Sequence, residues 1–90
     1  MQRRIESVDY SNRFLKKLSR LAPRIADDTE ARELIFKSDA FDPRLRTHKL
    51  HGKDKGAWAF WINNKYRIKF MFLGDTRVLF LDVGTHAIYS

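Results

Sequence analysis

The stretch from Ala57 to Val83, AWAFWINNKYRIKFMFLGDTRVLFLDV, decides the fold of this chain. It contains three segments rich in aromatic and β-branched residues, AWAFWIN, YRIKFMF and RVLFLDV, and such segments favour β-strands. The turn-forming sequences NNK and LGDT separate them. The sequence therefore predicts a three-stranded antiparallel meander over residues 57–83.

Side chains alternate between the two faces of a strand, which assigns faces to the residues of this meander. The middle strand has its apolar side chains on one face, namely Tyr66, Ile68, Phe70 and Phe72. On that same face we expect the apolar set of the last strand, namely Leu79, Leu81 and Val83. Because the shared apolar face must pack on the helices, Arg67 should lie on the opposite face together with Asp82. A one-residue slip in the first hairpin would invert its faces, so its register stays open.

The N-terminal half predicts one short strand and two helices. Alternation in RRIESVDY favours a strand from about Arg3 to Val8, and Ser11 is a good N-cap for the helix that follows. That helix ends before Pro23, and its apolar residues recur at helical spacing: Phe14, Leu15, Leu18 and Leu21. Pro23 suits the first turn of a second helix that runs to about Ser38. Its apolar stripe consists of Ile25, Thr29, Leu34, Ile35 and Phe36.

These elements define a fold class. Residues 38–47 carry turn formers without a clear period, so we expect a connecting loop there. The element order is then βααβββ, an α+β fold in which a small twisted antiparallel sheet packs on an N-terminal helical hairpin. Ninety residues with 43% hydrophobic content supply one core, so residues 1–90 should form a single domain.

The positive charge is concentrated in one segment. Residues 43–69 contain eight basic residues and one acidic residue, so they account for the whole net charge of +7. Such a segment attracts a polyanion, for example nucleic acid. A solubilising surface, or a docking face for an acidic protein, is the alternative explanation. If the partner is RNA, we expect its phosphates to be bound by the lysines Lys49, Lys53, Lys55, Lys65 and Lys69.

The composition also bears on the compartment. The chain contains no cysteine, so it carries neither disulfides nor thiolate metal sites. Its start, MQRRIESVDY, has charges where a signal peptide would be apolar, and no run of about 18 apolar residues occurs. We therefore expect a soluble cytoplasmic protein that does not bind a membrane.

Two segments carry a resemblance to a known family, HKLHGKDKGAWAFWINNKYRIKF at residues 48–70 and VLFLDVGTHAIYS at residues 78–90. With them the chain resembles the RelE/ParE superfamily of bacterial type II toxins, in particular its ribonuclease (mRNA interferase) branch. The resemblance covers essentially the whole chain and implies a RelE-like fold. It further implies a toxin that cuts mRNA in the ribosomal A site and contacts ribosomal RNA.

The same resemblance implies the partners. A cognate antitoxin would hold the toxin inactive, and operator DNA would be contacted only through the toxin–antitoxin complex. The alternative function within the superfamily is that of a non-enzymatic ParE-like toxin that inhibits DNA gyrase. A plain basic RNA-binding domain without activity is a more distant alternative.

Three side chains form a set suited to metal-independent RNA cleavage. Attack by the 2′-OH needs a base, a cation beside the phosphate and an acid that protonates the departing 5′ oxygen. Histidine exchanges protons near neutral pH, which suits His48 and His86. Arg67 presents a planar fork that grips two phosphate oxygens at once. Three histidines without carboxylates at a metal-ligand spacing make a poor zinc site, so we expect no metal and no cofactor.

The resemblance implies a role for each of four residues. His48 in HKLHG stands where similar toxins have a general base. Arg67 in YRIKF matches the strand arginine that contacts the scissile phosphate. His86 in GTH resembles the C-terminal histidine that serves as general acid or transition-state ligand. Tyr89 matches the terminal aromatic residue that stacks on a base or helps to align the phosphate.

Each of these residues also has a purely structural alternative. His48 could be an ordinary surface residue, and His86 could be an edge residue that closes the sheet. Arg67 could pair with Asp82 across the sheet, which would contribute about 0.2–1 kcal/mol. Tyr89 could simply pack against its neighbours.

The aromatic residues Trp58, Phe60 and Trp61 lie within the basic segment. Bases of single-stranded RNA stack on such rings. Large aromatic side chains in a central strand of a small domain, however, more often belong to the core. We therefore expect at least two of the three to be buried.

Overall fold

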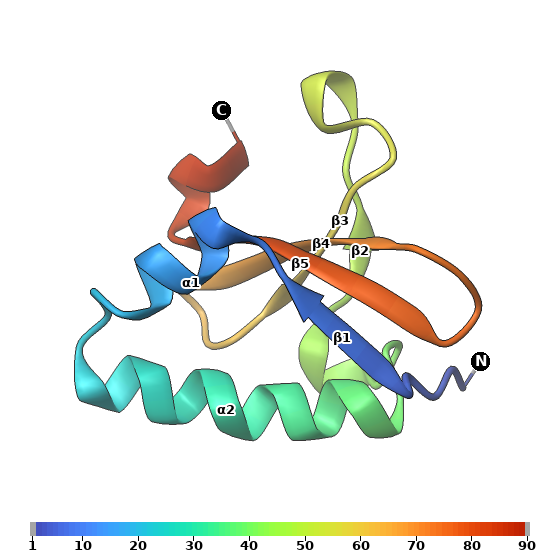
Figure 1. Ribbon diagram of the computed structural model, residues 1–90, viewed down its shortest axis with the longest axis horizontal. Helices are drawn as coiled ribbons and strands as arrows, with labels where there is room; N and C mark the ends of the chain where they lie inside the picture. The colour runs from blue at the N-terminus through green and yellow to red at the C-terminus, as the bar shows by residue number, and fades with distance from the viewer. Residues whose placement is uncertain (1, 90) are drawn as a thin grey trace.

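The computed structural model describes residues 2–89, and Figure 1 shows the arrangement of its elements. The helices among these residues are α1 (Asn12–Leu18) and α2 (Pro23–Ser38). The strands are β1 (Ser7–Tyr10), β2 (His48–Lys49), β3 (Trp58–Trp61), β4 (Arg67–Phe72) and β5 (Arg77–Gly84). Three short 3₁₀ turns complete them, η1 (Pro43–Leu45), η2 (Gly52–Asp54) and η3 (His86–Tyr89). No helix in this part of the chain is long and apolar enough to cross a bilayer.

The predicted meander and the α+β class are confirmed. β3 pairs with β4 and β4 with β5, both antiparallel. The strand order of the sheet is β1-β5-β4-β3-β2, and β1 runs parallel to β5, so the sheet is mixed rather than antiparallel throughout. The parallel pair joins strands from the two ends of the chain, and no local sequence pattern reports such a pairing.

The first strand lies further along the chain than predicted. It begins at Ser7 and ends at Tyr10, because the backbone groups of Arg3 and Ile5 bond to residues at and just after the end of α2. The N–H of Ile5 donates to the carbonyl of Lys37 over 2.9 Å, and the carbonyl of Arg3 accepts from the N–H of Ala40 over 2.8 Å. The apolar side chain of Ile5 is nevertheless buried.

Both helices begin where the sequence predicts. The hydroxyl of Ser11 accepts a hydrogen bond from the N–H of Phe14 over 3.0 Å and donates one to the carbonyl of Leu81 over 2.8 Å. An N-cap of this kind contributes about 1 kcal/mol, and here it also ties α1 to β5. α1 ends early, at Leu18, whereas α2 runs from Pro23 to its predicted end. One residue of the expected α2 stripe points outward, since Leu34 is 64% exposed.

The predicted loop over residues 38–47 contains structure that the sequence pattern did not indicate. Pro43–Leu45 form η1, with the side chain of Asp42 as its N-cap. Arg46 follows with a left-handed φ of 52°, and His48–Lys49 then pair with β3 as the short edge strand β2. Two residues are too few to show alternation, so periodicity could not reveal this strand.

The core is a cluster of phenylalanine side chains between the helices and one face of the sheet. The fully buried members are Phe14, Phe36, Phe60, Phe70 and Phe80. The ring of Phe36 from α2 stacks on Phe60 with centroids 4.6 Å apart and meets Phe70 edge-on at 4.9 Å. Such pairs contribute about 0.5–1.5 kcal/mol beyond the area that they bury. They fix α2 against β3 and β4.

A β-bulge interrupts the alternation of β5. Phe80 lies opposite Phe70, but the preceding residue of β4, Lys69, lies opposite Asp82. Leu81 is therefore the extra residue, and the pattern of faces shifts by one position at this point.

The bulge overturns part of the predicted face assignment. The buried apolar residues of β5 are Val78, Phe80 and Val83. Leu79 and Leu81 are half-buried and belong to the opposite face, contrary to the prediction, because the inserted residue exchanges the two faces of the strand. Asp82 lies opposite Lys69 and hence on the same face as Arg67, as predicted.

The second face of the sheet holds a smaller apolar cluster. Leu50, Ala57 and Ala59 are buried there, with Leu81 and Tyr89 packed against them. The small side chains of the two alanines leave room for the tyrosine ring that packs against them. Figure 1 shows η3 and the loop around η2 rising from this side, away from α2. The face opposite the helices is therefore where the two most distinctive sequence segments meet.

Candidate active site

A cleft of about 420 Å³ opens on this second face of the sheet. It is lined by Arg46, His48, Trp61, Arg67, His86 and Tyr89. All four residues predicted to be catalytic therefore line one cavity, although they come from β2, β4 and η3. The cleft also contains Arg46 and Trp61, which were not predicted as site residues.

Arg67 is held rigidly at the start of β4. Its Nη1 donates to the carbonyls of Asn63 and Tyr66 at 2.8 and 3.2 Å, and its Nη2 donates to the carbonyl of Asn64 at 3.2 Å. The turn between β3 and β4 thus occupies one edge of the guanidinium. The other edge carries Nε–H and the second Nη2–H, which form a parallel pair suited to two oxygens of a phosphate.

Trp61 supports two guanidinium groups. The Cζ atom of Arg67 lies 3.8 Å from the centroid of the indole, and that of Arg46 lies 4.4 Å from it. Arg67 is the cross-strand partner of Trp61, which explains the first contact. Arg46 was counted in the basic segment, but only the left-handed backbone before β2 brings it to the indole. The cleft therefore contains two cations where the sequence predicted one.

His48 lies at the exposed edge of the cleft, on β2. Its Nδ1 is 2.9 Å from the carbonyl oxygen of Arg46. A carbonyl oxygen can only accept, so Nδ1 carries the proton and Nε2 of the neutral ring has a free lone pair. The hydrogen bond thus selects the tautomer that can act as a base through Nε2.

His86 and Tyr89 form the opposite wall of the cleft. They are three residues apart in η3, so their rings meet edge-on with centroids 4.8 Å apart. The ring of Tyr89 also meets that of His48 edge-on at 6.3 Å. The ring of Tyr89 therefore contacts both histidine rings, and both histidines are exposed.

The phenol of Tyr89 is buried although the cleft is open. Its hydroxyl oxygen has no hydrogen-bond partner within residues 2–89. Burial raises the pKa of this phenol above its ordinary value, while Arg67 opposes the rise through its positive charge and through N–H groups close to the phenol oxygen. Tyr89 therefore remains a neutral phenol at physiological pH, and its hydroxyl lies near the guanidinium of Arg67.

The arrangement has the chemical parts of a phosphoryl-transfer site. Two imidazole rings, which can exchange protons near neutral pH, and a guanidinium, which can grip two phosphate oxygens, line one cavity. Within residues 2–89, no group of three or more His, Cys, Asp or Glu side chains is placed to hold a metal ion.

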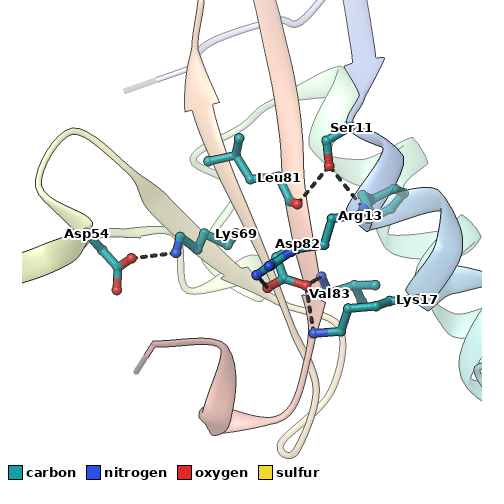
Figure 2. Close-up of polar contacts among 9 residues, drawn as sticks. Ser11, Arg13, Lys17, Asp54, Lys69, Leu81, Asp82 and Val83 are labelled. Carbon is teal, nitrogen blue, oxygen red and sulfur yellow. Dashed lines mark hydrogen bonds and ion pairs between the residues drawn. The ribbon is translucent and has the colours of Figure 1, made fainter.

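The five lysines predicted to bind RNA have different environments. Lys49, Lys53, Lys55 and Lys65 are exposed. Lys69 is different, because its ammonium group forms an ion pair with Asp54, and the two side chains are only 19% and 13% exposed (Figure 2). This ion pair ties the η2 loop to β4, so Lys69 is already partnered and has a structural task.

The structural alternatives for Arg67 and for the aromatic residues can be assessed directly. Arg67 lies opposite Gly84 and does not pair with Asp82, whose carboxylate instead contacts Lys17 at 2.7 Å. Of the three aromatic residues of β3, only Phe60 is buried, contrary to the prediction. Trp58 packs at the edge of the core and Trp61 lines the cleft, because they lie at the two ends of the strand.

Comparison with known proteins identifies the fold. No protein-family model and no curated protein matches the chain. Among solved structures it matches the YoeB/ParE toxin from Agrobacterium tumefaciens with a TM-score of 0.76 at 15% identity, over 90% of this chain and 99% of that chain. It matches YafQ in the E. coli DinJ-YafQ toxin-antitoxin complex with a TM-score of 0.67 at 22% identity, over 98% and 97% of the two chains.

A third match extends the comparison to an archaeon. It is to the RelE-RelB complex from Pyrococcus horikoshii OT3, with a TM-score of 0.68 at 16% identity, over 94% of this chain and 96% of that chain. The chain therefore has the RelE/ParE toxin fold over nearly its whole length, which confirms the fold that the sequence resemblance implied.

Proposed function

We propose that this protein is the toxin of a type II toxin–antitoxin pair and acts as a metal-independent endoribonuclease on mRNA, in the ribosomal A site. The observation that supports this most strongly is the cleft in which His48, Arg67, His86 and Tyr89 come together on a RelE-like scaffold. A gyrase inhibitor needs no pair of proton carriers around a phosphate-binding arginine. The cleft therefore favours the ribonuclease over the ParE-like alternative.

Three residues of the cleft carry out the proposed reaction, and each has one role. Nε2 of His48 takes the proton of the 2′-OH, and the 2′ oxygen forms a bond to phosphorus. The bond from phosphorus to the 5′ oxygen breaks, and His86 donates a proton to that oxygen. The products are a 2′,3′-cyclic phosphate and a 5′-hydroxyl. Arg67 binds the phosphate oxygens where charge accumulates in the transition state.

Tyr89 and the basic surface complete the proposal. The Tyr89 hydroxyl, which lacks a partner within residues 2–89, aligns a phosphate oxygen beside Arg67. The exposed lysines Lys49, Lys53, Lys55 and Lys65 bind phosphates of mRNA and of ribosomal RNA. Lys69 is proposed instead to hold the η2 loop in place through its ion pair with Asp54, and this loop carries Lys53.

The proposed partner is a cognate antitoxin. Two of the matched structures are complexes, RelE with RelB and YafQ with DinJ, the latter a toxin-antitoxin complex. A basic segment that carries the entire net charge of +7 would keep binding RNA unless a partner covered it. We expect an antitoxin segment with acidic residues to occupy this face, and operator DNA to be bound only through the complex.

The decisive experiment uses programmed ribosomes and an mRNA with a single 2′-deoxy nucleotide at the mapped cleavage site. We expect the unmodified mRNA to be cut, with a 5′-hydroxyl and a cyclic or 3′ phosphate at the new ends, and the deoxy mRNA to stay intact. His86→Ala should reduce the single-turnover rate by about 10²–10⁴ and leave binding unchanged. Cutting of the deoxy mRNA at the normal rate would exclude the internal nucleophile.

A parallel assay addresses the alternative. The purified protein is added to DNA gyrase, and supercoiling is followed at the same protein concentrations. We expect no inhibition. The gyrase-inhibitor function would be favoured if the wild type and His86→Ala inhibit supercoiling equally and the wild type does not cut mRNA.

A further inference from the structure

The two cleft residues His86 and Tyr89 belong to residues 84–89, called here the terminal turn. Within this turn only Ile88 is well buried, with 7% of its surface exposed, whereas His86 is exposed. The position of the exposed His86 therefore depends on how Ile88 is packed, whereas Tyr89 has a second support in its packing against Leu50, Ala57 and Ala59. Ile88 rests on Gly84, the last residue of β5.

A glycine is required at position 84 because a side chain there would clash with its neighbours. A Cβ atom at this position would lie 2.8 Å from Cγ2 of Ile88, closer than real Cβ contacts come. Its backbone φ is not positive, unlike those of Gly52 and Gly56, so conformational freedom does not explain the glycine. The contact atom is a methyl carbon attached directly to the branched Cβ of a buried residue, whose χ1 angle is restricted, so it cannot simply rotate away.

Lys17 from α1 approaches the same position from another part of the chain. The Nζ and Cε atoms of Lys17 lie 3.4 and 3.8 Å from the place where a Cβ would stand. An ion pair holds Lys17 there, because its Nζ is 2.7 Å from Oδ1 of Asp82, whose side chain is 8% exposed. Figure 2 shows Lys17 and Arg13 extending from α1 to Asp82 on β5.

Open space lies beside the terminal turn. A cavity of about 390 Å³ is lined by side chains of α1, β4 and β5 and by Gly84, Thr85, Ala87 and Ile88 of the turn. A turn with a cavity on one side can move when it is pushed, whereas a close-packed turn cannot. The packing of Ile88 on Gly84 therefore limits the movement of the turn on the side of this cavity.

We propose that Gly84 is a positioning residue, which sets the places of His86 and Tyr89 in the cleft through its contact with Ile88. Lys17 and Asp82 support it from α1 by holding the lysine stem against the glycine. The kinetic consequence of this proposal rests on the proposed ribonuclease function. The structural consequence does not, and can be measured without RNA.

The structural test is proton NMR of the imidazole groups. The chain has three histidines, and Tyr89 lies within ring-current distance of two of them, His48 and His86. In Gly84→Ala we expect the resonances of His48 and His86 to shift, because Tyr89 moves with the turn. His51 does not line the cleft and serves as the internal reference.

Gly74→Ala is the matched control. Gly74 lies in the β4–β5 turn, its φ is not positive, and a Cβ there would meet nothing within 4 Å. We expect it to leave all three histidine spectra and the cleavage rate unchanged. For Gly84→Ala we expect the single-turnover rate to fall about 10²-fold, the cost of a misplacement of about 1 Å, with RNA affinity unchanged.

A double-mutant cycle identifies the contact responsible. Ile88→Ala removes the atom that the new methyl would strike, so adding Gly84→Ala to it should cause no further fall in rate and no further histidine shift. If Gly84→Ala alone does not fold, the comparison of Ile88→Ala with the double variant still tests this contact. Rate effects that multiply in the double mutant, or unshifted His86 and His48 resonances in Gly84→Ala, would overturn the proposal. If the wild type cuts no RNA, the proposed function fails while the NMR comparison still decides the role of Gly84.

Discussion

Nδ1 of His48 lies 2.9 Å from the carbonyl oxygen of Arg46, and Arg46 has a left-handed backbone with φ of 52°. The unusual backbone conformation and the tautomer of the histidine are therefore linked. The hydrogen bond keeps the proton on Nδ1 and leaves Nε2 free to accept one. The same conformation directs the guanidinium of Arg46 toward Trp61.

The cost of this conformation can be measured by comparing Arg46→Gly with Arg46→Ala. Neither variant has the guanidinium, so the effect of removing its interaction with Trp61 cancels between them. Alanine in the left-handed region is disfavoured by about 1–2 kcal/mol, and glycine is not. We expect the glycine variant to have the higher free energy of unfolding by about 1 kcal/mol in urea titrations. Equal midpoints at equal slopes would mean that the backbone relaxes at this position.

Tyr89→Phe should separate stability from activity. The hydroxyl is buried and has no hydrogen-bond partner within residues 2–89, so its removal should raise the free energy of unfolding by about 1 kcal/mol. Cleavage should slow, because the hydroxyl is proposed to align the phosphate. Urea titration tests the predicted gain in stability, and single-turnover kinetics on the same preparation test the predicted loss of activity. A less stable but fully active variant would contradict both parts.

Arg67→Lys tests whether the fork of donors is needed. The lysine keeps the charge but cannot bond to the three turn carbonyls while also gripping two phosphate oxygens. We expect Arg67→Ala to lower the single-turnover rate by about 10²–10³ and Arg67→Lys to recover little of it. Arg77→Lys, at an exposed arginine outside the cleft, should keep the normal rate. Full recovery by Arg67→Lys would reduce the role to charge alone.

Replacement of Lys53 and Lys55 by alanine tests binding without chemistry. The slope of affinity against salt should flatten by about 0.7–0.9 for each phosphate that the protein no longer neutralises, while the rate at saturating substrate is unchanged. The control removes two exposed basic residues near α1, Lys16 and Arg20, and therefore the same charge. If both double variants flatten the slope equally, net charge and not the η2 loop is responsible.

Tyr10 predicts a change of stability at alkaline pH. Burial, and then a hydrogen bond and the charge of Glu33, raise the pKa of its phenol to about 12. The folded protein thus holds this proton more tightly than the unfolded chain, whose tyrosine pKa is about 10. The resulting stability is fully present below pH about 10 and is lost between about 10 and 12.

The measurement compares urea titrations of the wild type and Tyr10→Phe across this pH range. The wild type should lose more stability than the variant, since lysine titration is common to both. Parallel decreases in the two proteins would show that folding does not raise the phenol pKa of Tyr10.

Much of the fold is encoded locally and could be predicted. The meander over residues 57–83, the N-cap at Ser11 and the start of α2 at Pro23 follow from periodicity, capping chemistry and the geometry of proline. The four cleft residues were named from sequence motifs, and the structure brings them to one cavity. Their individual roles remain predictions.

What the sequence determined by itself was which residues alternate, where the helices start and where the charge is concentrated, because each depends on neighbours along the chain. The tertiary structure alone decided the parallel pairing of β1 with β5, the bulge at Leu81 and the pairing of Lys69 with Asp54. It also brought Arg46 and Trp61 into the cleft. The physical reason is that these contacts join segments distant in sequence, whose meeting depends on packing of the whole core and leaves no periodic signal in either segment.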